Sequence, residues 1–450
     1  MSTLTEFLEA ASQIIWGPIT LAMLLLVGVY LSCGLRLMPW RKIPTACKLL
    51  FQGRAADSSA GEIPPFQALM TALSATVGTG NIAGVATAIA LGGPGAIFWM
   101  WITAAFGMAT KYAEAVLAVK YRNQDQAGHY VGGPMYYIRN GLGKRWAWLG
   151  GLFAFFGMFA AFGIGNLVQA NSVAEALHTV WTVPNWLIAS VMTVLTAAVI
   201  LGGVKRIGEV ASFLVPVMAG VYISGAVYII SMHISEVPAV LHMVIDNAFN
   251  GKAAVGGFAG ATMWAAIRFG VARGVFSNEA GLGSAAIAHA AAKTNDPVKQ
   301  GLIAKLRVFI DTLINCTLTA LVILLSGVVD SGKTGAMLSI WAFQAGWHGG
   351  GLVVVFGLCV FAFTTILGWS YYGERCAQYL FGSKVILPYR LLWIMMVPVG
   401  TYGQLEFIWL LADVMNGLMA LPNLIALIGL SPVVFKLTRQ YFSNSTYGHP

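Results

Sequence analysis

The sequence predicts an all-α membrane protein with eleven transmembrane helices, on three observations. Of its 450 residues, 58% are hydrophobic and 10% are charged, whereas globular chains carry about 25% charged residues. Several apolar runs reach the ~20 residues needed to cross a bilayer. These runs do not alternate apolar and polar residues, as the strands of a β-barrel do. Soluble enzymes, disordered scaffolds and β-barrels are therefore excluded.

Charged residues, prolines and glycines divide the apolar sequence into eleven expected spans. In chain order, the spans cover residues 14–37, 66–90, 95–119, 147–172, 184–202, 208–232, 254–290, 303–328, 351–372, 385–401 and 405–434. No linker, low-complexity tract or soluble domain interrupts them. Residues 1–450 are therefore expected to form a single transmembrane domain.

The basic residues predict the orientation of the chain. Of the 26 Lys and Arg residues, 21 fall in loops after odd-numbered spans and in the C-terminal tail, and two, Lys252 and Lys333, fall in the opposite loops. Because cytoplasmic loops collect Lys and Arg, the N-terminus is predicted outside and the C-terminus inside a cell membrane. This arrangement accounts for the net charge of +9 without nucleic acid as a partner.

The first span is expected to remain in the mature protein, because no basic residue precedes Arg36 and a cleaved signal peptide needs a basic start. The five cysteines form no CxxC pair, and the seven histidines show no HxxxH spacing. We therefore predict neither a disulfide framework nor a transition-metal site.

The second span contains a glycine-rich stretch, Gly78-Thr79-Gly80-Asn81. Each glycine inside a helix costs about 1 kcal/mol relative to alanine, so these residues predict a break at mid-membrane depth. Such a backbone survives there only where it lines a cavity or is buried in protein. The alternative is close helix packing through Gly80 and Gly84, but a clustered GxGN exceeds what packing needs.

The seventh span predicts a second broken helix. Residues 264–279 hold Arg268, Arg273, Glu279 and two glycines, and charges facing lipid would cost several kcal/mol. An extramembrane loop between two short helices is the alternative, but an extra crossing would destroy the charge asymmetry of all later loops. A discontinuous helix is therefore favoured.

The two breaks lie five spans apart, in helices of opposite orientation. Residues 66–232 and 254–434 then form two five-helix units related as an inverted repeat, which is the plan of many secondary transporters. The span at 14–37 is an extra helix ahead of this core.

Three motifs carry a resemblance to a known family. Residues 77–96 (VGTGNIAGVA, then GGPGA), 270–285 (GVARGVFSNEAGLGSA) and 361–374 (FAFTTILGWSYYGE) resemble signatures of the alanine/glycine:cation symporter family. The similarity runs from about residue 15 to 435. It implies a leucine-transporter-type fold and import of small neutral amino acids driven by sodium, or sometimes by protons.

An amino-acid zwitterion needs N–H donors for its carboxylate and acceptors for its ammonium group. Thr79 and Gly80 match the carboxylate cradle of the fold, where an unwound turn frees N–H groups and a half-helix offers its positive end. The ammonium group is expected at free carbonyls near Phe269 and Gly270, at the break in the seventh span.

Three further side chains are candidates for the substrate pocket. Gln169 of the fourth span is expected to reach the substrate, whereas Asn166 and Asn171 are expected to bond neighbouring helices. Phe276 and Trp369 are expected to roof the pocket, although an arbitrary tryptophan in such a chain is more often a packing residue or an interface anchor. An indole there would leave room for a side chain of methyl size.

The sodium site is expected between the second and ninth spans. Hydroxyls of Thr364 and Thr365, with carbonyls freed at Ser74 and Val77 and the carbonyl of Phe361, would supply its oxygens without a carboxylate. The alternative is that both threonines bond carbonyls of their own helix. The position of the pair matches the sodium-site helix of this fold.

Charged residues inside spans are functional candidates. Glu279 is expected to form a local ion pair or gate near the break with the arginines of its own span, with a proton-coupling role as the alternative. Lys111 and Glu114 lie one turn apart, and these two residues and Asp311 are expected to be paired structural groups.

The predicted function is symport of L-alanine, D-alanine or glycine with sodium by alternating access. A proton-coupled transporter or exchanger of the same fold is the alternative. The absence of HExxH and GxSxG motifs argues against an intramembrane enzyme, and no repeated filter-like loop suggests a channel. Membrane lipid is the other expected partner, with no obligate protein partner.

Overall fold

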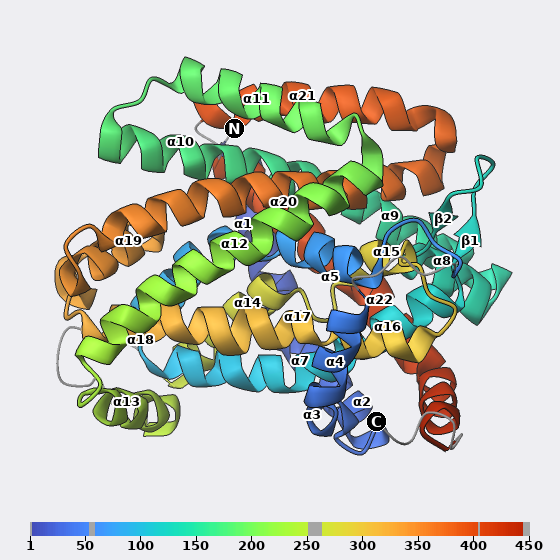
Figure 1. Ribbon diagram of the computed structural model, residues 1–450, viewed down its shortest axis with the longest axis horizontal. Coiled ribbons are helices and arrows are strands. Elements are labelled where there is room, and N and C mark those ends of the chain that lie inside the picture. Colours follow the sequence, from blue (N-terminus) through green and yellow to red (C-terminus); the bar gives the residue numbers. More distant parts are fainter. Residues whose placement is uncertain (1, 54–58, 251–262, 404–405, 444–450) are drawn as a thin grey trace.

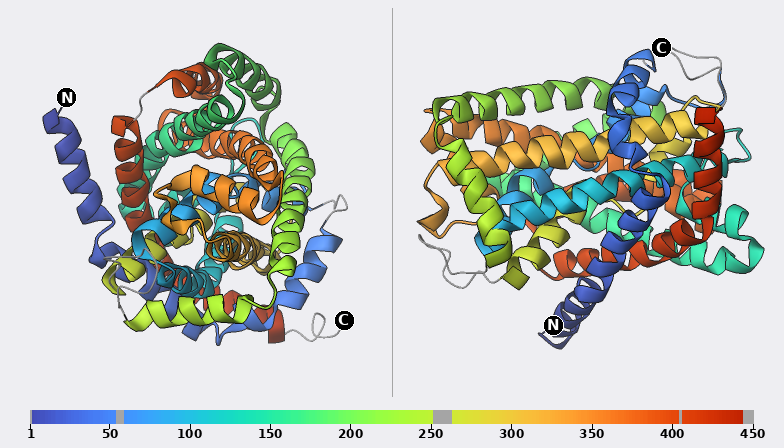
Figure 2. Two further views of the ribbon diagram at one scale, coloured as in Figure 1. Left: turned by 90° about the vertical axis from the view of Figure 1, so that its left-hand side faces the viewer. Right: turned by 90° about the horizontal axis from the view of Figure 1, so that it is seen from below.

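The computed structural model describes residues 2–53, 59–250, 263–403 and 406–443. These residues form a bundle of helices with one antiparallel hairpin of strands β1 (Asn123–Gln124) and β2 (Tyr130–Val131). Several long helices, among them α7 and α20, run roughly along the horizontal axis of Figure 1. The N-terminal helix α1 lies at the edge of the bundle, where it contacts α22 (Figure 2).

The first part of the chain, up to the long helix α12, supplies sixteen helical segments. They are α1 (Ser2–Ile15), α2 (Pro18–Gly34), α3 (Met38–Arg41), α4 (Ile43–Gln52), α5 (Pro65–Ser74), η1 (Gly80–Gly84), α6 (Val85–Gly92), α7 (Gly95–Lys120), α8 (Pro134–Tyr137), η2 (Ile138–Leu142), η3 (Lys144–Trp146), α9 (Ala147–Phe162), η4 (Gly163–Leu167), α10 (Val168–Trp181), α11 (Asn185–Ile200) and α12 (Gly203–Met232).

The second part continues the bundle. Its helical segments are α13 (Val237–Asn250), α14 (Met263–Asn278), α15 (Ser284–Ala290), α16 (Pro297–Ala304), α17 (Leu306–Val308), η5 (Phe309–Cys316), α18 (Thr317–Leu325), η6 (Val329–Ser331), α19 (Gly335–Gly346), α20 (Gly350–Phe381), η7 (Ser383–Val385), α21 (Ile386–Tyr402) and α22 (Glu406–Ser443).

Eight helices of the described chain are long and apolar enough to cross a bilayer, and two shorter apolar stretches, Gly80–Gly92 and Asn185–Ile200, accompany them. The chain is therefore a multi-pass membrane protein, as predicted. The count of eleven spans and the inverted repeat stay predictions.

Two helices, α13 and α19, occupy stretches that the sequence analysis left between spans. They have 14 and 12 residues, fewer than the ~20 needed to cross a bilayer. Their apolar residues therefore do not form runs of membrane-spanning length. Helix α19 contacts η1 and α20, which brings it against the broken second span.

Both spans that were predicted to be broken are broken. Helix α5 ends at Ser74 and the chain resumes helical structure at Gly80, which is the break expected in the second span. In the seventh span, α14 ends at Asn278 and α15 begins at Ser284. Residues 254–262 of that predicted span lie outside the described residues.

Helix α14 is packed tightly against α7, and its glycines explain how. A Cβ added to Gly270 would lie 2.3 Å from the carbonyl oxygen of Ala96, and one on Gly274 would lie 2.9 Å from Oγ1 of Thr103. Such distances are below van der Waals contact, so only glycine permits this approach of the two helices. The glycines of α14 therefore serve helix packing.

Candidate functional site

The break in the second span places the start of a helix in the protein interior. Thr79 is the N-cap of η1, and no side chain caps this helix start. The first N–H groups of a helix have no partner within it. Asn81 stabilises the turn, because its Oδ1 accepts a hydrogen bond of 3.0 Å from the N–H of Gly78. Thr79 and Asn81 are both buried, so the break is held inside the bundle.

Gln169, which was expected to reach the substrate, contacts this break from α10. Its Nε2 donates to Oγ1 of Thr79 at 3.3 Å and to the carbonyl of Ile164 at 2.9 Å. Its Oε1 is buried and has no hydrogen-bond partner in the described chain. A buried acceptor without a partner is costly, so Gln169 offers an oxygen that a ligand donor can satisfy.

The end of α14 closes the other side of the site. A Cβ added to Gly80 would lie 3.4 Å from Cδ1 of Phe276 and 3.5 Å from Cα of Ser277. The positive N-terminal end of η1 therefore lies against the negative C-terminal end of α14. Phe276, a predicted site residue, is thus in contact range of the predicted cradle.

The expected free carbonyls at Phe269 and Gly270 are a wrong prediction. Both residues lie within α14, which is helical from Met263 to Asn278, so their carbonyls belong to a continuous helix. The break lies nine residues further on, where Glu279, Gly281 and Gly283 have φ of +51°, +91° and +80°. Glycine favours such φ values, and this left-handed backbone ends the helix.

Four of the five predicted sodium ligands form two hydrogen-bonded pairs at α5 and α20. Oγ1 of Thr365 donates to the carbonyl oxygen of Ser74 at 3.0 Å, and a Cβ on Gly78 would lie 2.7 Å from the same hydroxyl oxygen. Oγ1 of Thr364 donates instead to the carbonyl of Phe361, one turn earlier in α20, at 3.0 Å. Thr365 thus bridges the two helices, whereas Thr364 shows the alternative bond within its own helix.

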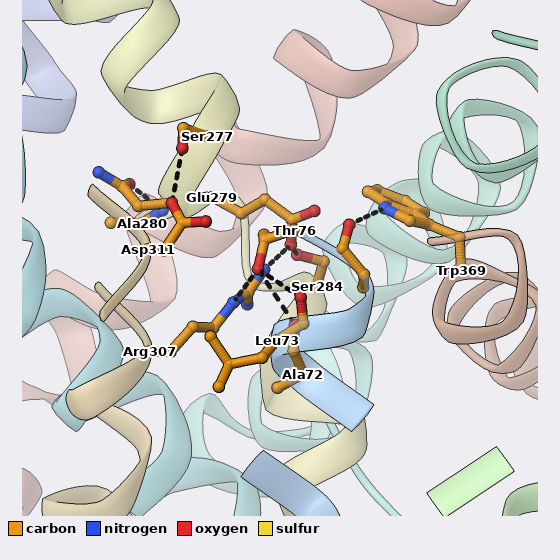
Figure 3. Close-up of polar contacts among 12 residues, drawn as sticks. Ala72, Leu73, Thr76, Ser277, Glu279, Ala280, Ser284, Arg307, Asp311 and Trp369 are labelled. Atoms are coloured by element: carbon orange, nitrogen blue, oxygen red, sulfur yellow. Dashed lines mark hydrogen bonds and ion pairs between the residues drawn. The ribbon is translucent and has the colours of Figure 1, made fainter. Parts of the chain in front are cut away.

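Trp369 contacts the break from α20. Its Nε1 donates at 3.1 Å to the carbonyl of Ala75, a residue freed where α5 ends (Figure 3). A Cβ on Gly165 would lie 2.2 Å from Cβ of Trp369, so η4 and α20 approach closely around the indole. Trp369 is 1% exposed and contacts the break directly.

A buried polar cluster joins the two breaks and was not anticipated as a unit. The carboxylate of Asp311 accepts hydrogen bonds from Nδ2 of Asn81 at 2.8 Å, from Oγ of Ser277 at 2.6 Å and from Oγ1 of Thr312 at 3.1 Å. All three donors are uncharged, and Asp311 is 0% exposed. Carboxylate, hydroxyl and amide oxygens are ligands that hard cations prefer. An acidic residue inside an apolar span was the available signal.

Glu279 forms a long-range ion pair, which corrects the expected local one. Its Oε2 lies 2.7 Å from Nη2 of Arg307, and Nε of Arg307 donates to Oγ1 of Thr76 at 3.0 Å (Figure 3). The arginines of α14 face aromatic rings instead, with Arg268 over Phe269 and Arg273 over Phe276. Arg307 therefore connects the break in the second span to the break in the seventh.

Lys111 and Glu114 form the predicted pair, with Nζ and Oε2 2.8 Å apart and both side chains 1% exposed. The other carboxylate oxygen of Glu114 accepts hydrogen bonds from the N–H groups of Gly281 and Gly283, at 3.0 and 3.1 Å, and from Nδ2 of Asn423 at 2.8 Å. Glu114 thus binds the backbone of the second break in addition to forming an ion pair with Lys111.

Asn166 and Asn171 bond neighbouring helices, as was expected of these two amides. Asn166 and Asn171 donate to the carbonyls of Trp393 and Gly403, at 2.8 and 3.2 Å.

A cavity of about 270 Å³ leads to Thr79 and Phe276. Glu175 of α10 and Arg273 of α14 line its walls, and Thr334 and Met337 lie where α19 covers it. The cavity lining includes two of the predicted substrate residues but not Trp369. Together, the cavity and the facing helix ends can admit a small zwitterion and satisfy both of its charges.

Comparisons with known proteins show which family the chain resembles. A family model described as the sodium:alanine symporter family matches residues 1–449. The sodium/alanine symporter AgcS of Methanococcus maripaludis is 49% identical over 445 residues, which cover 97% of each chain. The probable sodium/glutamine symporter GlnT of Bacillus subtilis is 40% identical over 444 residues, covering 97% of this chain and 91% of its own.

Among solved structures, MhsT in complex with L-phenylalanine is similar, with a TM-score of 0.56 and 13% identity. The match covers 84% of this chain and 99% of that chain. At this identity the likeness concerns the fold alone, and it confirms the predicted leucine-transporter-type fold.

Proposed function

The chain belongs to the sodium:alanine symporter family, and from this premise we propose that it carries alanine or glycine across a cell membrane together with sodium. The observation that carries this proposal is the meeting of two broken helices at Gly80 and Phe276. Broken helices at the bilayer midplane are the usual binding element of secondary transporters. Transport needs no covalent chemistry, so the protein is proposed not to be an enzyme.

The substrate carboxylate is proposed to bind at the start of η1. The N–H groups near Thr79 and Gly80 have the positive end of a half-helix behind them. The ammonium group then faces the last carbonyls of α14, beside Phe276, rather than Phe269 and Gly270. The unpaired Oε1 of Gln169 is a further acceptor for it. A zwitterion thus spans two helix ends of opposite polarity.

The proposed sodium site uses the carbonyls of Ser74, Val77 and Phe361 with the hydroxyls of Thr364 and Thr365. The bond of 3.0 Å from Thr365 to Ser74 supports it, because it sets two of the proposed oxygens side by side. To bind sodium, the hydroxyl of Thr364 would give up its hydrogen bond to the carbonyl of Phe361 and coordinate the ion instead.

A proton-coupled transporter of the same fold is the second candidate, and one observation favours it. Asp311 is a fully buried carboxylate whose hydrogen-bond donors are Asn81, Ser277 and Thr312, all neutral. A buried carboxylate at a helix break can carry a proton as well as bind a cation. Glu279 suits this task less well, since it is paired with Arg307.

Uptake by the purified protein in liposomes separates these candidates. An inward sodium gradient should drive accumulation of labelled L-alanine, and unlabelled glycine or D-alanine should compete. Potassium in place of sodium should reduce uptake to the level of empty liposomes. Accumulation that follows a pH gradient and is indifferent to sodium would replace sodium symport by the proton-coupled alternative.

The proposed location is the cell membrane, with the N-terminus outside and the C-terminus in the cytoplasm. Membrane lipid is then the surrounding partner, and the proposal requires neither nucleic acid nor an obligate protein partner. In this orientation the cavity beside Glu175 and Arg273 opens toward the outside, as import requires.

A further inference from the structure

A second cavity, of about 370 Å³, lies where the end of α2, the start of α3 and the last turns of α22 meet. Four cationic side chains line it, from Arg36, Arg41, Lys42 and Arg439. No carboxylate is among its described lining residues. This cavity shares no lining residue with the cavity at Thr79.

The backbone at this point is held in an unusual conformation. Arg36 and Leu37 both have φ of +54°, which L-residues other than Asn and Asp seldom adopt. These two residues form the turn that joins α2 to α3, and the turn places Arg36 and Arg41 at the same cavity. Strained residues of this kind persist where the surrounding structure or a function maintains them.

Aromatic rings extend the cavity along the seam between α2 and α22. The ring of Phe435 lies in edge contact with Tyr30, with centroids 5.9 Å apart, and Nζ of Lys42 lies 5.2 Å from the centre of Phe442. Leu26, one helical turn before Tyr30, is 65% exposed. A cationic cavity thus leads directly into an apolar seam on the outside of the bundle.

We propose that this cavity binds the headgroup of an anionic phospholipid, with the acyl chains lying along the α2–α22 seam. The cations match a phosphodiester, and basic pockets between transmembrane helices on the cytoplasmic side bind such headgroups. The charge asymmetry predicts that this end of α2 is cytoplasmic. Loose basic residues alone would satisfy that asymmetry, whereas four cations gathered at one cavity beside an apolar seam are suited to a lipid. The proposal does not depend on the transported substrate.

The test measures lipid binding by the purified full-length protein, by native mass spectrometry and by thermal stabilisation. Phosphatidylglycerol should bind and stabilise, and phosphatidylcholine should do neither. Inorganic phosphate and glycerol 3-phosphate distinguish the sources of the phosphate group, since neither has acyl chains. Equal stabilisation by these soluble anions, or by phosphatidylcholine, would overturn the assignment to an anionic lipid.

Variants then locate the binding. Arg36→Ala/Arg41→Ala/Arg439→Ala should weaken phosphatidylglycerol binding roughly a hundredfold, given the contribution of each basic residue near an anionic headgroup. All three side chains are exposed, and the corresponding triple Arg→Lys variant should keep most of the binding.

The matched control removes three exposed cations of the same predicted side, in Lys144→Ala/Arg145→Ala/Lys205→Ala. It should bind phosphatidylglycerol as the wild type does. If both triple alanine variants lose binding equally, the interaction is with general surface charge and the cavity is not the site.

Discussion

At the scale of the residue, Gly80 has the most direct role in the proposed site. A Cβ there would touch Phe276 at 3.4 Å, which is ordinary contact, so alanine fits the unliganded protein. The further atoms of a leucine would fill the space between η1 and α14 where the substrate carboxylate approaches the backbone.

We therefore expect Gly80→Leu to abolish alanine uptake while the protein remains folded. The measurement is uptake into liposomes together with the melting temperature with and without alanine. Gly151→Leu is the control, since a Cβ on Gly151, a glycine of α9, meets nothing within 4 Å. Normal uptake by a folded Gly80→Leu protein would show that the substrate carboxylate does not bind at Gly80.

Thr365 and Thr364 allow a second test, because the structure distinguishes two neighbours that the sequence treats alike. Thr365→Val removes the hydroxyl that reaches Ser74 across the helices. It should raise the sodium concentration for half-maximal uptake by roughly tenfold, the scale on which the loss of even an outer partner weakens metal binding.

Thr364→Val removes a hydroxyl bonded within its own helix, so its effect should be smaller, and the double variant should be the most impaired. The readout is alanine uptake titrated with sodium. If the double valine variant keeps the sodium dependence of the wild type, both threonines are packing residues and the ion binds elsewhere.

The sequence predicted several of these contacts and missed others for a physical reason. Gln169 was a candidate site residue and contacts Thr79, because a polar side chain in an apolar span must face a polar interior. The partnership of Asp311 with Ser277 was not predicted, since it depends on how η5 turns toward α14. Spacing along one chain carries no information on the mutual rotation of two helices.

At the scale of the element, the breaks show what glycine content can and cannot predict. The second and seventh spans are both rich in glycine, and both helices are interrupted, as their glycine content predicts. Gly270, however, serves close packing on Ala96, whereas Gly281 and Gly283 supply positive φ. Composition does not separate these two uses of glycine, so the glycines of the seventh span predict that it is broken but not where the break lies.

The second break depends on a buried carboxylate, which leads to a third prediction. Glu114 accepts from the N–H groups of Gly281 and Gly283 as well as from Lys111. Glu114→Gln leaves Lys111 buried without its partner and replaces the anion at the break, so it should lower the free energy of unfolding by about 3–5 kcal/mol.

Lys111→Met is the matched comparison for Glu114. It removes the salt bridge but leaves the carboxylate with three N–H donors, from Gly281, Gly283 and Asn423. It should therefore be less destabilising than Glu114→Gln when unfolding is followed in detergent. Equal losses would mean that the ion pair, and not the support of the break, is the main role of Glu114.

At the scale of the whole molecule, polar groups are concentrated where the two broken spans meet. Arg307 connects Thr76 to Glu279, and Asp311 connects Asn81 to Ser277. Both connections run through α17 and η5, which lie between the breaks. Movement of one broken helix therefore disturbs polar contacts of the other. Alternating access requires such coupling between the two halves.

The orientation of the whole molecule gives the last prediction. The uneven division of Lys and Arg between the two sets of loops predicts that Ser331, in the loop before α19, faces outside and that Arg145 faces the cytoplasm. Both side chains are exposed. A single cysteine at either position can report its side of the membrane by reaction with an impermeant maleimide.

The background for this experiment replaces the three partly accessible cysteines, Cys33, Cys47 and Cys359, by serine, because Cys316 and Cys376 are buried. In intact cells Ser331→Cys should react at once, and Arg145→Cys should react only after the membrane is permeabilised. The opposite result would mean that the chain has the inverse orientation in the membrane, with the cavity at Thr79 facing the cytoplasm. Reaction of both cysteines in intact cells would mean that the number of crossings between them is even, which contradicts the predicted spans.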